Sequence, residues 1–278
     1  MFLLSDTSLA LAAGIFLVAA AVIAFAGTRL AVIADELADR TGLGEVVAGA
    51  IFVGISTSLP GILTSVLTAA QGYPQLSIGN ALGSLTAQTG FLAVADLFYR
   101  RANLEHAAAS VTGLAQGVLF IALMTVPLFA ASFPLAVWGV DISSFAMVAG
   151  YAMGLRLLTQ IKAEPMWVPV QTSETREDQS EAPEDEDGKG AAQVWWRFVL
   201  FAGLTGAAGY FIAESGVAII NQTGMSQTAV GTVFTGVATS LPELVTAVMA
   251  VRIGAVGLAV GDVLGGNAFD VLFLGVAD

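Results

Sequence analysis

The tetrapeptide Thr57-Ser58-Leu59-Pro60 occurs a second time in the chain, as Thr239-Ser240-Leu241-Pro242, 182 positions further on. At this shift residues 49–96 align without gaps with residues 231–278, and about 19 of the 48 positions are identical. Self-similarity at a fixed spacing is the signature of an internal repeat. Two unrelated apolar segments can match by composition, but they do not share such a block together with glycines in register. The chain therefore contains two copies of one structural unit.

The composition around these copies is that of a membrane protein. Of the 278 residues, 56% are hydrophobic and 12% are charged, and the mean hydropathy is +0.81, whereas about 25% of residues are charged in a soluble domain. A spanning helix needs roughly 20 apolar residues. The first run is read as a span and not as a signal peptide, because residues 1–9 contain no Lys or Arg. The sequence predicts eight transmembrane helices, at about 6–28, 44–70, 76–98, 109–131, 135–158, 195–220, 227–250 and 258–277.

The positive charges predict the orientation of these helices. Lys and Arg are retained on the cytoplasmic side of membranes. If the N-terminus lies outside, all ten Lys and Arg residues fall on inner loops or inner helix ends, and the connections near 71–75, 131–133 and 221–227 contain none. We therefore expect an N-terminus outside, an even number of helices in the chain and a location in the plasma (inner) membrane.

The domain organisation follows from the repeat. The second predicted helix corresponds to the seventh, which is five helix steps further on, and because this number is odd the two copies are expected to be inverted across the membrane. We predict a first five-helix repeat at 1–160 with its motif at 44–98, and a second, incomplete repeat at 195–278 with its motif at 226–278. The segment 161–194 has eight acidic residues between 174 and 187, mixed with Pro, Ser and Gly. This composition predicts a solvated cytoplasmic linker, and a regulatory cation-binding role is the alternative.

Inverted repeats place a binding site near the membrane midplane, at Gly or Pro interruptions in both copies. Proline frees the carbonyl four residues earlier, so Pro60 and Pro242 each expose a backbone oxygen at membrane depth. Hydroxyl groups stand next to both prolines, on Thr57, Ser58, Thr239 and Ser240. Hard cations such as Na⁺ and Ca²⁺ bind oxygens of these kinds. The alternative is that the hydroxyls only satisfy the backbone of a kinked helix.

Three carboxylates in the second copy strengthen the prediction of a cation site. Glu243, Asp262 and Asp270 lie inside predicted spans, where a charge costs about 2.5–3.5 kcal/mol and a functional role is the default interpretation. Asp262 and Asp270 are about 12 Å apart along a helix, so only one of them can lie beside Glu243. Asp141 and Glu214 are nearer the outer helix ends, where we expect hydration and assign no role.

At these residues the chain resembles the cation/calcium exchanger superfamily, whose members include the sodium/calcium exchangers. Members carry two inverted repeats, each with a motif of the type Gly-Thr-Ser-x-Pro-Glu followed by Gly-Asn-x-x-Gly-Ser-Asn-x-x-Asn or Asp. The second copy reads Ala238-Thr239-Ser240-Leu241-Pro242-Glu243 and then Gly261-Asp262-Val263-Leu264-Gly265-Gly266-Asn267-Ala268-Phe269-Asp270. The resemblance implies an all-α inverted-repeat transporter with ten helices, five per half, of which eight are present.

The resemblance also implies a central site for the transported cation. Its implied ligands are Glu243, Asp270, Thr57, Thr239, Ser84 and Gln88, with backbone carbonyls near Gly54 and Gly236. Ser58, Ser240 and Asp262 complete the candidate set. The first copy departs from the family pattern, because Gly61 stands where a glutamate is expected, Leu85 where an asparagine is expected and Gln88 where Asn or Asp is expected. In the second copy Gly266 replaces the usual serine.

These observations favour a secondary active antiporter that exchanges Na⁺ or H⁺ for Ca²⁺ by alternating access. Glu243 and Asp270 are the only carried-over carboxylates, so a monovalent cation/proton antiporter is the first alternative. A degenerate, non-transporting repeat protein is the second. If the shift of 182 positions is continued, residues 102–158 correspond to positions beyond Asp278. We therefore expect an incomplete reading frame or a partner chain that completes the fold.

Several functions are not expected from the sequence. No set of nucleophile, base and orienting group can be drawn from the polar residues, so an enzyme is not expected. The absence of cysteine excludes disulfides and thiolate metal sites. We expect contacts with membrane lipid and transported Na⁺ and Ca²⁺, but no resident cofactor and no nucleic acid. The sequence does not predict the oligomeric state.

Overall fold

A computed structural model of the chain describes most of its length. The described residues are 4, 7–41, 55–100, 102–132, 135–137, 140–168, 170, 172–173, 190–254 and 256–277. The first part of the predicted helix at 44–70, the carbonyl of Gly54 and the acidic residues between 174 and 187 lie outside this range, so their predicted roles remain predictions.

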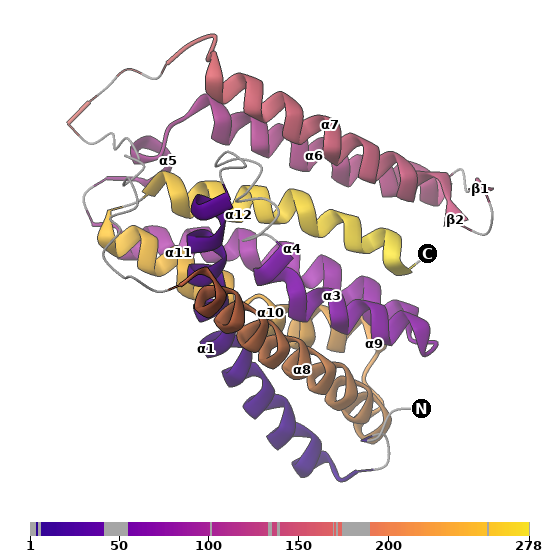
Figure 1. Ribbon diagram of the computed structural model, residues 1–278. Helices are drawn as coiled ribbons and strands as arrows, with labels where there is room; N and C mark the ends of the chain where they lie inside the picture. The colour runs from indigo at the N-terminus through magenta and orange to yellow at the C-terminus, as the bar shows by residue number, and fades with distance from the viewer. Residues whose placement is uncertain are drawn as a thin grey trace.

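Helices form nearly all of the described structure (Figure 1). The first half contains α1 (Leu9–Thr41), α3 (Ile55–Ala70), α4 (Pro74–Phe98), α5 (Leu104–Ala107), α6 (Val111–Ser132), β1 (Ala136–Val137), β2 (Val140–Asp141) and α7 (Ile142–Ala163). The second half contains α8 (Ala191–Thr223), α9 (Gln227–Ala229), the π-helical turn η2 (Val230–Thr235), α10 (Gly236–Thr239), α11 (Leu241–Ile253), α12 (Val256–Asp270) and the 3₁₀ segment η3 (Val271–Ala277). Strands β1 and β2 form a small antiparallel hairpin.

Five of the described helices are long and apolar enough to cross a membrane, namely α1, α4, α6, α7 and α8. A sixth span arises if the segments Gln227–Thr239 and Leu241–Arg252, which meet at an angle of 44°, are counted as one broken helix. Helix α3 is shorter, with 16 residues. The prediction of a mostly helical, multi-pass membrane protein is therefore confirmed, whereas the count of ten helices and the side of the N-terminus remain predictions.

Two predicted helices differ from the structure in ways that have clear causes. The prediction that a helix begins near 135 was wrong, because α7 begins at Ile142 after the hairpin. The side chain of Asp141 accepts a hydrogen bond from the backbone N–H of Ser143 at 2.8 Å, which is the preferred way to cap a helix start. The predicted helix at 227–250 is broken at Ser240, next to Pro242, as the helix-breaking motif predicted, because the proline ring cannot continue the helix in the ordinary way.

The long helices α1 and α8 extend the internal repeat beyond the segments that the sequence alignment identified. Both contain 33 residues, and their bounds differ by the same 182 positions. Gly27 of α1 packs on Pro242, since a Cβ added there would lie 2.4 Å from the proline Cγ. Gly209, the counterpart of Gly27, packs on Pro60, with an added Cβ 2.8 Å from its carbonyl oxygen. Each proline is thus contacted by the long helix of the other half.

The helices lie in three layers (Figure 1). Helices α6 and α7 form one outer layer and α1 and α8 the other, with α3, α4 and the broken helices of the second half between them. Apolar clusters join the layers, for example Leu85 and Ala268 with Leu123 and Met147. The outer layers expose large apolar side chains, among them Leu17, Phe25, Ile121 and Phe129, as expected where lipid is the solvent. Most of the buried polar residues therefore lie in the middle layer.

Candidate cation-binding site

Buried polar side chains gather where the broken helices of the middle layer cross. Each of these side chains is at most 5% exposed: Ser56, Thr57, Ser58, Asn80, Ser84, Gln88, Thr239, Ser240, Glu243, Asn267 and Asp270. They come from α3, α4, α10, α11 and α12, so both halves of the chain contribute. Polar groups removed from water cost free energy unless they find partners. Such a concentration of polar groups inside a membrane protein marks a functional site.

Asp270 occupies the centre of this cluster. The hydroxyl of Ser58 donates a hydrogen bond to Oδ1, and Nε2 of Gln88 donates to Oδ2 at 2.6 Å. Both carboxylate oxygens therefore act as acceptors, as an ionised carboxylate does. Gln88 is the counterpart of Asp270 in the first repeat. Equivalent positions of the two halves thus face each other across the site.

Glu243 supplies the second buried carboxylate. It lies in the first turn of α11, directly after Pro242, and is 2% exposed. A helix N-terminus favours negative charge, because its unpaired N–H groups carry partial positive charge. The Thr57 hydroxyl hydrogen-bonds the carboxyl group, and the charge of Asp270 acts on it. Glu243 and Asp270 are therefore the two acidic members of the described buried cluster.

The two repeats are held together by a close backbone crossing of α4 and α10. A Cβ added to Gly236 would lie 2.8 Å from backbone atoms of Gly83, so neither glycine can carry a side chain without a shift. Next to this crossing the Ser84 hydroxyl lies 3.3 Å from the Gly236 carbonyl oxygen and 3.3 Å from Oγ1 of Thr239. This carbonyl and these hydroxyls lie between the two halves.

Several buried oxygens of the cluster have no hydrogen-bond partner in the structure. They are Gln88 Oε1, Ser240 Oγ, Glu243 Oε2 and Asn267 Oδ1. An unsatisfied buried polar group costs about 1–3 kcal/mol. Carboxylate, carbonyl and hydroxyl oxygens are the ligands of hard cations. The donor set at this crossing therefore fits a cation such as Na⁺ or Ca²⁺.

The structure brings most of the described site residues of the prediction together and leaves one of them, Asp262, outside the buried cluster. Thr57, Ser58, Ser84, Gln88, Thr239, Ser240, Gly236, Glu243 and Asp270 belong to the buried cluster. Gly54 lies outside the described residues. Asp262 lies apart from the cluster, is only partly buried and accepts a hydrogen bond from Thr246 at 3.3 Å. Among the described residues, no group of three or more His, Cys, Asp and Glu side chains could jointly hold a metal ion.

Three members of the cluster, Ser56, Asn80 and Asn267, were not in the predicted site. The two asparagines are 0% exposed. Nδ2 of Asn80 donates to the Gly61 carbonyl at 3.2 Å and to Oγ of Ser65 at 3.0 Å, and Nδ2 of Asn267 donates to Oγ1 of Thr89 at 3.2 Å. A signal for Asn80 was present in the sequence, because Asn80 is the repeat counterpart of Asp262.

The two remaining acidic residues of the sequence prediction have different environments. The expectation that Glu214 is hydrated was wrong, since it is 1% exposed and its Oε2 accepts a hydrogen bond from the backbone N–H of Leu4 at 2.9 Å. Leu4, which precedes α1, therefore contacts α8. Asp141 is at the hairpin, where hydrogen bonds from Ser143 keep the pKa of its carboxyl group below the ordinary value.

The carboxylates are confined to one half of the site. The repeat counterparts of Glu243, Asp262 and Asp270 are Gly61, Asn80 and Gln88, which are all neutral. Gly61 nevertheless has space beside it, because a Cβ added there would meet Oγ1 of Thr239 at 3.6 Å and Nδ2 of Asn80 at 3.9 Å. These are ordinary van der Waals contacts, so the backbone position of Gly61 accepts a Cβ without a shift.

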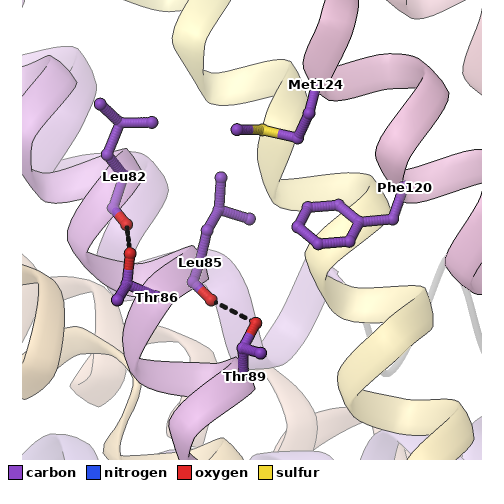
Figure 2. Close-up of a pocket in the computed structure, with 6 residues that line it drawn as sticks. All are labelled: Leu82, Leu85, Thr86, Thr89, Phe120 and Met124. Carbon is purple, nitrogen blue, oxygen red and sulfur yellow. Dashed lines mark hydrogen bonds between the residues drawn. The ribbon is translucent and has the colours of Figure 1, made fainter.

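An apolar pocket lies beside the site, between α4 and α6 (Figure 2). It has a volume of about 300 Å³ and is lined by Leu82, Leu85, Thr86, Thr89, Phe120 and Met124. Its two hydroxyls donate to backbone carbonyls of their own helix, Thr86 to Leu82 and Thr89 to Leu85, both at 2.8 Å. The pocket offers no ionisable group and is separate from the carboxylates.

Broken and proline-containing helices that meet at buried carboxylates define a class of protein, the multi-pass membrane proteins of ion transport. The family model described as sodium/calcium exchanger protein matches residues 11–159 and 193–277. The match covers most of the chain, including all the described residues of the buried cluster. The protein belongs to the sodium/calcium exchanger family, within the cation/calcium exchanger superfamily.

Three comparisons illustrate this relationship. The inner membrane protein YrbG of Escherichia coli is 25% identical over 268 residues, which cover 95% of this chain and 78% of YrbG. The sodium/calcium exchanger MaX1 of Methanosarcina acetivorans is 35% identical over 92 residues, or 33% of this chain and 26% of MaX1. The solved structure of the sodium/calcium exchanger from Methanococcus jannaschii has the same fold, with a TM-score of 0.56 at 22% identity, and covers 97% of this chain and 81% of that one.

Proposed function

We propose that the protein is a secondary active antiporter that exchanges Na⁺ or H⁺ for Ca²⁺ at a site between its two halves. The observation that carries this proposal is the buried pair Glu243 and Asp270 at the crossing of the broken helices, with unpartnered oxygens around it. Family membership supports cation transport as the class of function. MaX1, which is similar over one third of this chain, is described as a sodium/calcium exchanger.

The buried charges also supply a reason for coupled exchange. Two ionised carboxylates in an apolar layer are costly when no counter-charge is present. A bound cation removes most of this cost, because its positive charge compensates the negative charges of the two carboxylates. We therefore propose that the halves rearrange from one access state to the other only when a cation or protons occupy the site. Such a rule makes exchange obligatory and prevents a leak of one ion alone.

A monovalent cation/proton antiporter is the second candidate, and a specific observation favours it. The first half supplies Gly61, Asn80 and Gln88 where the second supplies three carboxylates. Ca²⁺ affinity rises with the number of charged ligands, and only Glu243 and Asp270 among the described residues of the buried cluster are acidic. If one of the two is protonated, a monovalent ion balances the remaining charge.

The arrangement in the membrane is part of the proposal. We propose ten spanning helices in the complete transporter, five per half, with the two repeats inverted and the linker at 161–194 on the cytoplasmic side. The Lys and Arg residues support an N-terminus outside and a location in the plasma (inner) membrane. We propose repeat bounds at 1–160 and 195–278, and the 182-residue offset between α1 and α8 supports two equivalent halves.

Ion flux in proteoliposomes tests the proposal. We expect uptake of ⁴⁵Ca²⁺ driven by an outward Na⁺ or H⁺ gradient, and we expect Glu243→Gln to abolish it. Glu214→Gln is the matched control, because it makes the same change at another buried glutamate that lies outside the site. Proton-coupled Na⁺ or K⁺ movement without Ca²⁺ uptake would favour the second candidate. A folded protein with no flux of any kind would identify a non-transporting repeat protein.

A further inference from the structure

One face of α12 leads from the surface of the protein to the buried carboxylates. Asp262, Gly266 and Asp270 follow each other at intervals of four residues, and residues four apart lie on the same face of a helix. Asp262 is partly exposed, whereas Asp270 is 2% exposed. The helical rise places the two carboxylates about 12 Å apart along the helix axis. We refer to Asp262, Gly266 and Asp270 as the α12 stripe.

The middle of the α12 stripe has no side chain. A Cβ added to Gly266 would meet only Oε1 of Gln88, at 3.8 Å. This amide oxygen has no hydrogen-bond partner although Gln88 is 1% exposed. In the first half, the counterpart of Gly266 is Ser84, whose hydroxyl donates to the Gly236 carbonyl. The second half thus lacks the side chain that fills this place in the first, and an oxygen able to bind a cation faces the gap.

Helix α11 provides polar groups along the α12 stripe. Thr246 and Glu243 are three residues apart, so they lie on one face of α11. The Thr246 hydroxyl lies within hydrogen-bond distance of Oδ2 of Asp262, at 3.3 Å, and of the backbone carbonyl of Glu243, at 3.1 Å. Glu243 Oε2 has no hydrogen-bond partner. The two helices together present oxygens from the partly exposed Asp262 to the buried site.

The first half has no equivalent of this arrangement. Asn80, the counterpart of Asp262, is neutral and 0% exposed, and its amide group bonds to Gly61 and Ser65. Asp262 lies toward the end of the bundle at which α11 and α12 are joined. At this end Arg252 stacks on the ring of Phe98, 4.9 Å from its centroid. We call it the Arg252 end; in Figure 1 it is the end at which α5 lies, opposite the hairpin.

Building on the proposed function, we propose that Asp262 and Thr246 form a capture site for hydrated Na⁺ or Ca²⁺ on the path between the Arg252 end and the Glu243–Asp270 site. A charged group in a cleft raises the local concentration of counter-ions and their rate of association. One partly exposed carboxylate attracts a cation without stripping its water. The ion then moves along the α12 stripe, past Gly266 and Oε1 of Gln88, to the two buried carboxylates.

Flux measured separately from the two membrane faces tests this proposal. In right-side-out and inverted vesicles, we expect Asp262→Asn to lower the initial rate of ⁴⁵Ca²⁺ uptake about tenfold from the Arg252 end at a subsaturating concentration. Saturating Ca²⁺ should restore this rate, and uptake from the opposite face should change less than twofold. Asparagine is the residue that the first repeat carries at this position. Glu105→Gln removes the charge of an exposed side chain of α5 at the same end and is the matched control.

A second measurement does not depend on transport. The chain contains no cysteine, so Asp262→Cys introduces a single thiol. We expect a membrane-impermeant, positively charged methanethiosulfonate reagent to modify it from the Arg252 end only, and we expect 10 mM Ca²⁺ to slow the reaction at least threefold. A thiol that does not react from that end, or that reacts at a rate independent of Ca²⁺ and Na⁺, would overturn the capture site.

The outcomes separate this proposal from the proposed function. A wild-type protein that exchanges no cation contradicts the proposed function, on which the capture site rests. If the wild type exchanges cations but Asp262→Asn lowers the rate of uptake equally from both faces, only the capture site is contradicted. A general structural defect would slow uptake from both faces alike. Slowing from the Arg252 end that saturating Ca²⁺ does not restore contradicts it as well, since a capture site acts through local concentration.

Discussion

A carboxylate introduced at Gly61 should convert the site toward divalent ions. Gly61 is the repeat counterpart of Glu243, and an added Cβ would point toward Thr239 with 3.6 Å to its hydroxyl. The variant Gly61→Glu therefore adds a third negative charge at a position where the backbone leaves room. The space beside Asn80 Nδ2, at 3.9 Å from the same Cβ, also permits a hydrogen bond to the new carboxylate.

The expected magnitude follows from the charge of the ion. A carboxylate about 4 Å from a unit charge contributes about 4 kcal/mol at an effective dielectric constant near 20, and twice that for a divalent ion. The costs of burying the introduced carboxylate and of its repulsion from Glu243 and Asp270 are the same for both ions, so they cancel in the selectivity. The Ca²⁺ over Na⁺ preference should thus rise by up to about 4 kcal/mol, or roughly a thousandfold. We expect at least tenfold after screening.

Equilibrium binding to the purified protein measures this selectivity. The Kd for ⁴⁵Ca²⁺ and the Na⁺ concentration that displaces half of it are compared between wild type, Gly61→Glu and Gly61→Gln. The glutamine variant has the size of glutamate without the charge, so it should leave the selectivity within about threefold. If Gly61→Glu changed the Ca²⁺ over Na⁺ selectivity no more than Gly61→Gln does, the reasoning would be refuted. Such a result would show that position 61 does not face the bound ion.

Three further predictions concern residues that pack against the site or donate hydrogen bonds to Asp270. Gly209→Ala places a methyl group 2.8 Å from the Pro60 carbonyl oxygen, so it should lower the free energy of unfolding by about 1–3 kcal/mol and lower the melting temperature in detergent. The control Gly203→Ala, whose added Cβ has nothing within 4 Å, should not lower the melting temperature. Ser58→Ala removes a donor to Asp270 and should weaken cation binding by about tenfold, a loss near 1.4 kcal/mol, while Ser144→Ala on α7 should leave the Kd unchanged. Gln88→Leu, which removes both the donor to Asp270 and the unpartnered Oε1, should weaken binding more than Ser58→Ala; equal Kd values for the two variants would contradict the role of Oε1.

The sequence predicted the membrane class and most of the helices, because both depend on local composition. A run of about 20 apolar residues has one stable form in lipid. The repeat was visible because Pro60 and Pro242 each end a copy of the same four-residue sequence, Thr-Ser-Leu-Pro. The short hairpin of β1 and β2 was missed because Ala136, Val137 and Val140 are apolar like the residues of a span. The capping role of Asp141 is seen only when the backbone N–H of Ser143 is placed.

Long-range contacts set the limit of the sequence prediction. The pairing of Gln88 with Asp270 joins residues 182 positions apart, and the burial of Glu214 depends on Leu4, 210 positions away. Neither partner is visible in the local pattern. Asp262 was grouped with the site because it is a charge within a span, but its separation from Asp270 along α12 places it outside the buried cluster. The roles of all these residues in ion binding remain predictions for experiment.

The central claim is that Glu243 and Asp270 jointly bind the transported cation. Binding of ⁴⁵Ca²⁺ to the purified full-length protein tests it most directly, with wild type, Glu243→Gln and Asp270→Asn measured under the same conditions. The account predicts saturable Ca²⁺ binding that Na⁺ displaces and that each of the two substitutions weakens by at least a hundredfold. Binding of unchanged affinity in both variants would contradict it.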